Sequence, residues 1–130
     1  MSNTYNIGLT TGQIHLAVDI TTVGLAATRA SVLIVNNNSP GVPVAHSVDA
    51  TGDINGKPIG GGVSLKGKRL TIFTMVTLTG DDPNVRAIEA QAVRGQYELS
   101  GGDEDIKSFN NPVKSFQDPN VFVISVIDLL

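Results

Sequence analysis

The sequence predicts an all-β fold, a two-sheet antiparallel sandwich of about seven to eight strands that forms one domain over residues 1–130. Three observations predict it. Val, Ile, Thr and Gly are abundant while Glu, Lys and Gln are sparse, a mixture that suits pleated sheets better than helices. Several runs alternate apolar and polar residues with a period of two, as half-buried strands do. Fourteen glycines and six prolines supply frequent turns.

The first two alternating runs are predicted to be strands. One covers Thr4–Thr10, and the second places Ile14, Leu16, Val18 and Ile20 on a single face. Only Thr11-Gly12 separates the two runs. They are therefore close enough to form a hairpin, although this dipeptide is not a standard hairpin turn.

The middle of the chain alternates predicted strands with turn-rich segments. A strand over Ala27–Val35 is followed by a shorter one over Val42–Val48. Pro43 places the shorter strand at a sheet edge, because proline lacks the N–H that a central strand needs. Residues 49–62 are rich in Gly, Asp and Asn and are predicted to be a loop, with a brief strand over Val63–Leu65.

The strongest strand signal in the sequence covers Leu70–Leu78. After it, Asp82-Pro83 resembles a helix start, with a capping side chain followed by a proline in the first turn. We expect a short helix near residues 83–89 and a strand over Ala90–Leu99. Residues 106–120 are predicted to be loop or weak strand, and Val121–Ile127 closes the domain as a strand.

Composition and charge exclude several classes of function. A formal net charge of −3 disfavours nucleic-acid binding, because a phosphate backbone repels a negative surface. No apolar run is long enough to span a bilayer, and the N-terminus has no signal-peptide pattern. We therefore expect no membrane partner. By default we expect a cytoplasmic location, with export by another route left open. The absence of cysteine removes thiolate metal sites.

No motif indicates catalysis or a cofactor. Gly62 and Gly67-Lys68 have the spacing of a phosphate-binding loop, but Arg69 replaces its Ser or Thr and a strand follows instead of a helix, which favours a polar turn. His46-Ser47 does not make a triad, because triads are assembled in space from separated residues. We therefore expect that the protein is not an enzyme and binds no cofactor.

Two loops are candidates for binding a ligand. Asp49, Thr51, Asp53 and Asn55 space oxygen side chains as a calcium loop does, but the Gly and Glu that such a loop requires are missing. The acidic run Asp103–Asp105 is expected to be solvated surface charge. The alternative function is therefore a ligand-binding β-sandwich for carbohydrate or calcium that uses loops 49–62 and 101–120.

Two predicted strands carry apolar side chains on both faces, whereas a strand of a two-layer sandwich needs only one buried face. Large exposed apolar patches are uncommon on monomers, so the helix near 83–89, the loop over 49–62 or another molecule must cover the second face. The residues that we expect on it are Phe73, Met75, Phe122, Ile124 and Val126.

This second face suggests the leading function. We expect a non-enzymatic structural or protein-interaction module whose partner is another protein or a second copy of the same chain, with a homo-oligomer favoured.

Overall fold

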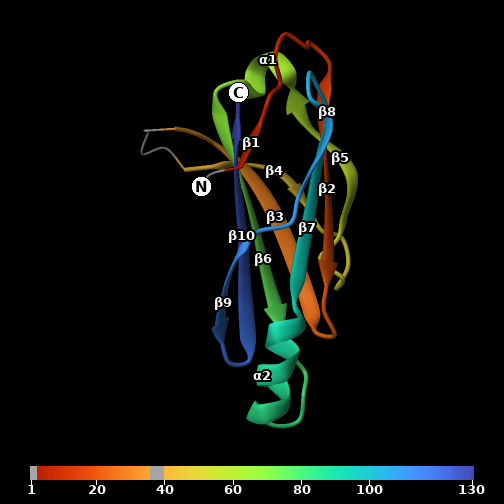
Figure 1. The fold of residues 1–130 in the computed structure, drawn as a ribbon, viewed down its shortest axis with the longest axis vertical. Helices are drawn as coiled ribbons and strands as arrows, with labels where there is room; N and C mark the ends of the chain where they lie inside the picture. Colours follow the sequence, from red (N-terminus) through yellow and green to blue (C-terminus); the bar gives the residue numbers. More distant parts are fainter. Residues whose placement is uncertain (1–2, 36–39) are drawn as a thin grey trace.

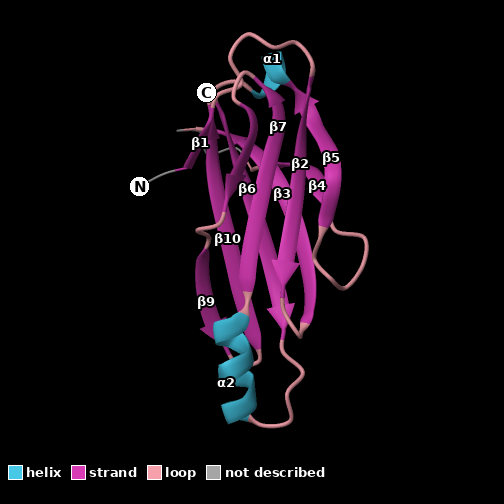
Figure 2. Cartoon of the chain, turned by 45° about the vertical axis from the view of Figure 1, so that its right-hand side comes forward, coloured by secondary structure: helices cyan, strands magenta, loops and turns pink. Residues whose placement is uncertain are grey.

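The computed structural model describes residues 3–35 and 40–130, and within them it confirms the all-β sandwich (Figure 1). Two sheets face each other along most of the long axis, with one short helix at each end (Figure 2). The described residues form ten strands, more than the seven to eight expected. Neither helix in this part of the chain has the length and apolarity needed to cross a membrane.

Sheet A is built around the last strand of the chain. Its strands follow the order β1 (Asn3–Tyr5), β10 (Asn120–Leu129), β6 (Lys68–Thr77), β3 (Leu25–Ile34) and β4 (Val42–His46). A sixth strand, β9 (Val113–Gln117), pairs with residues 120–124 of β10, while β1 pairs with residues 127–129 on the same edge. All pairs are antiparallel except β1 with β10.

Sheet B has four antiparallel strands in the order β5 (Ile54–Gly61), β2 (Gln13–Thr21), β7 (Arg94–Gly102) and β8 (Asp105–Phe109). Strand β5 lies where a loop over 49–62 was predicted, so that prediction is wrong for residues 54–61. Its glycines and Pro58 are typical of turns and leave no alternation of apolar and polar residues that would predict a strand. Its pairing with β2 is irregular at two points. Two further strands, β8 and β9, lie in the 106–120 segment that was predicted to be loop or weak strand.

The N-terminal run does not form the expected hairpin with β2. Strand β1 instead lies parallel to the end of β10 in the other sheet. The Ile7 N–H donates to the Leu130 carbonyl oxygen at 2.8 Å, and the Leu130 N–H donates to the Tyr5 carbonyl oxygen at 2.9 Å. Backbone hydrogen bonds thus join the N-terminal and C-terminal segments. The alternation of residues within one run predicts a strand but not the strand with which it pairs.

The two helices differ in how well the sequence predicts them. Helix α2 (Pro83–Ala92) begins as expected at Pro83, with the Asp82 side chain accepting the Val85 N–H, but it extends three residues beyond the predicted end. Helix α1 (Gly62–Leu65) is a single turn where a brief strand was predicted. Leu65 is buried, so its apolar character reflects packing rather than membership of a sheet.

The core lies between the sheets and follows the predicted alternation. Strand β6 buries Leu70, Ile72, Thr74 and Val76, and β10 buries every second residue from Val121 to Leu129. The hydroxyls of Thr28 and Thr74 share a buried hydrogen bond of 2.7 Å across β3 and β6. This bond satisfies two polar groups that would otherwise cost free energy on burial.

The two tyrosines are both buried, but their hydroxyls have different surroundings. The Tyr5 hydroxyl donates to the Asp105 carbonyl oxygen and accepts the Gly102 N–H at 2.8 Å, which ties β1 to the turn before β8. The Tyr97 hydroxyl has no hydrogen-bond partner among the described residues. Burial raises the pKa of Tyr97 to about 12.

We predict that Tyr97→Phe stabilises the protein. An unsatisfied buried hydroxyl costs about 1–3 kcal/mol, so the variant should unfold at a higher urea concentration at pH 7. Between pH 10 and 12 the unfolded chain ionises Tyr97 while the folded protein keeps it neutral, so the wild type loses stability as the pH rises. The phenylalanine variant lacks this loss, and its advantage should grow by on the order of 2–3 kcal/mol. A variant that is less stable at every pH would contradict the prediction.

Candidate functional site

The five residues predicted on the second face lie together on the outer face of sheet A. In the register of β6 and β10, Phe122 is opposite Met75 and Ile124 is opposite Phe73, while Val126 lies opposite Thr71. Directly opposed residues of an antiparallel pair point to the same face of the sheet. We call the set Phe73, Met75, Phe122, Ile124 and Val126 the outer patch.

The outer patch is partly exposed to solvent. Met75 and Val126 are 39% and 37% exposed, and the other three side chains are half-buried by one another. The rings of Phe73 and Phe122 have centroids 5.9 Å apart, and the Arg29 guanidinium carbon lies 5.5 Å from the Phe73 centroid. The two rings therefore pack against each other instead of standing free in solvent.

Of the two segments proposed as an internal lid, only the start of the 49–62 segment reaches the outer patch, where Asp49 and Ala50 line a hollow with Met75. Residues 54–61 form β5 in the opposite sheet. Helix α2 lies past the end of the sandwich, where β6 finishes (Figure 1).

Neighbouring strands extend the outer patch with residues that the sequence did not reveal. Val113 of β9 lies opposite Ile124, and Ala27 of β3 lies opposite Met75. Val113 is 70% exposed. Its segment was predicted to be loop or weak strand, so its face within a sheet could not be assigned. The resulting apolar band crosses β9, β10, β6 and β3.

Polar groups border the apolar band along the strands. At one end, Arg69 Nε donates to Asp128 Oδ1 at 2.7 Å, and this contact raises the pKa of the Arg69 guanidinium. At the other end, the Thr77 hydroxyl donates to Asn120 Oδ1 at 3.2 Å. An apolar centre with a polar border is the arrangement found in protein–protein interfaces.

The two histidines lie on strands of different sheets. His15 lies on β2 in sheet B and His46 on β4 in sheet A. Ser47 is engaged by Thr28, whose N–H donates to the Ser47 hydroxyl oxygen at 2.9 Å. The Gly62–Arg69 segment forms α1 and the start of β6, and Lys66 Nζ donates to the Gly8 carbonyl oxygen.

The acidic side chains of the two predicted binding loops mostly hold the backbone. Asp49 accepts from the Thr51 hydroxyl and N–H, which lowers the Asp49 pKa, and Asp53 accepts the Ile20 N–H at 2.9 Å. Glu104 accepts the Asn6 N–H at 2.6 Å. In residues 3–35 and 40–130, no three of His, Cys, Asp and Glu gather into a group that could hold a metal ion.

The outer face of sheet B carries a polar groove. Ala17 is the shortest side chain in its middle and lies opposite Glu98, while Asp19 lies opposite Gln96. A hollow of about 450 Å³ forms over Ala17, and a second of about 330 Å³ adjoins it. The two hollows share Asp19 and Gln96, and both predicted binding loops contribute, through Asp53 to Asn55 and through Ser108 to Pro112.

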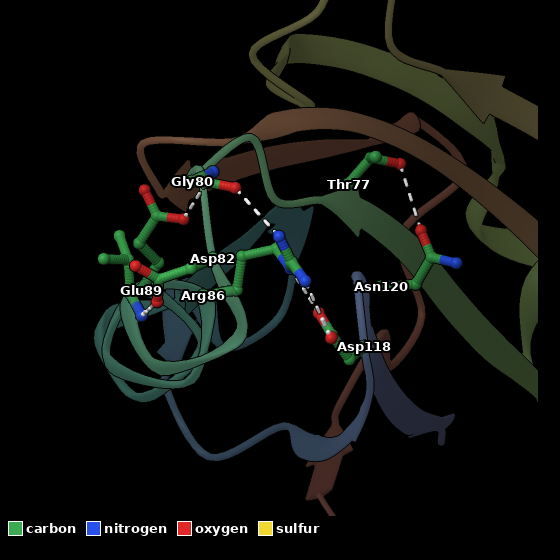
Figure 3. Close-up of polar contacts among 8 residues, drawn as sticks. Thr77, Gly80, Asp82, Arg86, Glu89, Asp118 and Asn120 are labelled. Carbon is green, nitrogen blue, oxygen red and sulfur yellow. Dashed lines mark hydrogen bonds and ion pairs between the residues drawn. The ribbon is translucent and has the colours of Figure 1, made fainter.

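Helix α2 is fixed to the sandwich by a set of polar contacts at its base (Figure 3). Arg86 donates from Nε to Asp118 Oδ1 at 2.6 Å, from Nη2 to Asp118 Oδ2 at 3.1 Å, and from Nη1 to the Gly80 carbonyl oxygen at 3.0 Å. Glu89 accepts the Gly80 N–H at 3.0 Å. The Arg86 guanidinium lowers the pKa of Asp118, and the middle of the helix is held to the turn after β6 and to the turn before β10.

Comparison with known proteins finds no family model, no curated protein and no solved structure that matches this chain.

We predict that Asp118→Asn loosens α2 without unfolding the sandwich. Loss of the charged pair with Arg86 should accelerate amide hydrogen exchange in residues 86–92 and leave exchange in β2 and β7 unchanged. Because the Asp118 pKa is lowered in the folded protein, its contribution is present above the ordinary carboxyl pKa and is lost as the pH falls below it. Acidification should therefore reproduce the effect of the variant.

Asp81→Asn is the matched control, because it removes an exposed carboxylate next to the same helix. Equal acceleration in both variants would show that general charge, rather than the Arg86–Asp118 pair, holds the helix.

Proposed function

We propose that the protein is a non-enzymatic structural or interaction module that associates with copies of itself through the outer patch of sheet A. The observation that supports this proposal is the partly exposed apolar band on a sheet face that β5 and α2 leave open and that Asp49 and Ala50 border only beside Met75. Removing apolar surface from water contributes roughly 25 cal/mol per Å². The exposed atoms of Met75, Val113 and Val126 are therefore available to stabilise an assembly.

The shape and order of the outer patch support a second copy as the occupant. Sheets pack face to face about 10 Å apart, with the side chains of the two facing surfaces interdigitated. A sheet face that meets its own copy around a two-fold axis forms an interface in which each side supplies the same residues. The Phe73 and Phe122 rings are already packed on each other, which reduces the side-chain entropy lost on association.

We predict that Met75→Lys dissociates the assembly. Lysine at this exposed position places a charge in the centre of the proposed interface and should weaken self-association at least about tenfold, or roughly 1.4 kcal/mol. Val126→Lys should act in the same direction. Sedimentation velocity over a concentration series measures the effect, and circular dichroism checks that the fold persists.

Gln96→Lys is the matched control, because it adds the same charge to the outer face of sheet B. The proposal fails if the wild type stays monomeric at the highest attainable concentration, or if Gln96→Lys dissociates it equally.

A second candidate function, binding of carbohydrate, is favoured by the polar groove on sheet B. Its carboxylate and amide side chains offer paired donors and acceptors of the kind that neighbouring sugar hydroxyls accept and donate to. The calcium form of this alternative has less support, because Asp49 and Asp53 are engaged with the backbone.

We predict that the wild type is retained on at least one oligosaccharide of a glycan array and that Asp19→Ala weakens this retention about tenfold or more. Asp19 lines both hollows, so its loss removes an acceptor from the centre of the groove. Met75→Lys, on the opposite face, should bind like the wild type. Absence of retention on every glycan would remove this candidate.

A further inference from the structure

Helix α2 presents an apolar ridge at one end of the molecule. Ile88 is 69% exposed and Val85 is 41% exposed. The two residues are three apart and therefore lie on the same side of the helix. The opposite side, around Ala90, is buried against the sandwich. We call Val85 and Ile88 the α2 ridge.

The α2 ridge is held in a defined orientation. Contacts of Arg86 with Asp118 and of Glu89 with Gly80 fasten the inward side of the helix (Figure 3). A ridge on a fixed base loses little conformational freedom when a partner binds. This preorganisation distinguishes it from the exposed apolar residues of loops, such as Leu9.

An apolar pocket, which we call the α1 pocket, lies beside α1. Figure 1 places α1 and α2 at opposite ends of the long axis. The pocket has a volume of about 270 Å³, and the described residues that line it include Val32, Val44, Ile59 and Leu65. It opens where β4 of sheet A and β5 of sheet B meet along an edge of the sandwich. A cavity of about 150 Å³ holds benzene, so this pocket has room for one or two aliphatic side chains.

The charges beside the ridge and beside the pocket are opposite in sign. Asp81 and Asp82 are exposed at the start of α2, whereas Glu89 and Asp118 are engaged with Gly80 and Arg86 on the inward side. Lys68 lines the pocket. At the same end, Glu104 is paired with Lys107 and holds the N-terminal segment. Asp81 and Asp82 beside the ridge would attract Lys68 at the pocket, whereas the same carboxylates on two facing ridges would repel each other.

We propose that the α2 ridge of one copy docks into the α1 pocket of a second copy and joins the two molecules end to end. This inference rests on the proposed self-association and adds a contact distinct from the outer patch. Ile88 enters the pocket, and Asp81 faces Lys68 at its rim.

The arrangement makes the contact heterologous, since each copy gives a ridge and receives one in its pocket. Such contacts do not stop at two copies; they close into a ring or continue as a filament. Figure 1 places α1 and α2 at opposite ends of the molecule, so each copy that joins leaves one ridge and one pocket free for further copies.

Engineered cysteines test the contact directly, because the chain has none of its own. Ile88→Cys is mixed with an isotope-labelled Ser64→Cys protein, since Ser64 lines the pocket, and a mild oxidant is added. A disulfide forms only when the two Cα atoms come within about 7 Å. Mass spectrometry should find the mixed 88–64 disulfide at least about tenfold above the mixed disulfide with Val48→Cys, an exposed control position.

The inference is overturned if the 88–64 disulfide does not exceed this control, or if 88–88 disulfides dominate. A charge exchange provides an independent measurement. Asp81→Lys on the Ile88→Cys chain should lower the yield of the 88–64 disulfide about tenfold, and Lys68→Glu on the Ser64→Cys chain should do the same. Mixing the two altered chains should restore the yield.

A separate arm distinguishes this inference from the proposed function. In the Met75→Lys background, the outer patch is disabled but the 88–64 disulfide should form as before. Conversely, Ile88→Lys should remove species larger than the outer-patch dimer while leaving that dimer intact by light scattering. If Met75→Lys leaves the assembly unchanged, the proposed function fails; if Ile88→Lys leaves it unchanged, the end-to-end contact fails.

Discussion

The register of β6 against β10 is the constraint on which the rest of the structure depends. It places Val121, Val123 and Ile127 inward with Ile72, and it places Phe122 and Ile124 outward with Phe73. A slip by one residue would exchange the two faces, because side chains of a strand alternate with a period of two. The inner face is thereby committed to the core, and an apolar outer face follows from the same pairing.

This pairing also explains why the two ends of the molecule differ. Strand β6 begins beside α1 and ends before α2, and β10 runs back along it. The turn that precedes β10 supplies Asp118, which fastens the helix reached from the other strand. One antiparallel pair thus positions the outer patch on its face, Lys68 and the α1 pocket towards one end and helix α2 at the other.

Strong local alternation is the part of this fold that the sequence could predict. Residues 70–78 and 121–127 were placed on the correct faces because each run carries its own pattern, and Asp82-Pro83 predicted the start of α2. Strand β5 was missed because glycine and proline make up half of it, so it has no alternating pattern of its own. It forms a strand through its pairing with β2, which its own sequence does not reveal. Val113 and the α1 pocket were missed because each depends on pairing between segments far apart in the chain.

The parallel pairing of β1 with β10 has a mechanical consequence. The two terminal strands run in the same direction, and Ile7 and Leu130 add backbone bonds beyond the end of their ladder. Tension applied between the N-terminal and C-terminal segments would slide one strand along the other and load these bonds simultaneously rather than peel them one after another. Strand β1, although it has only three residues, would therefore act as a clamp against stretching.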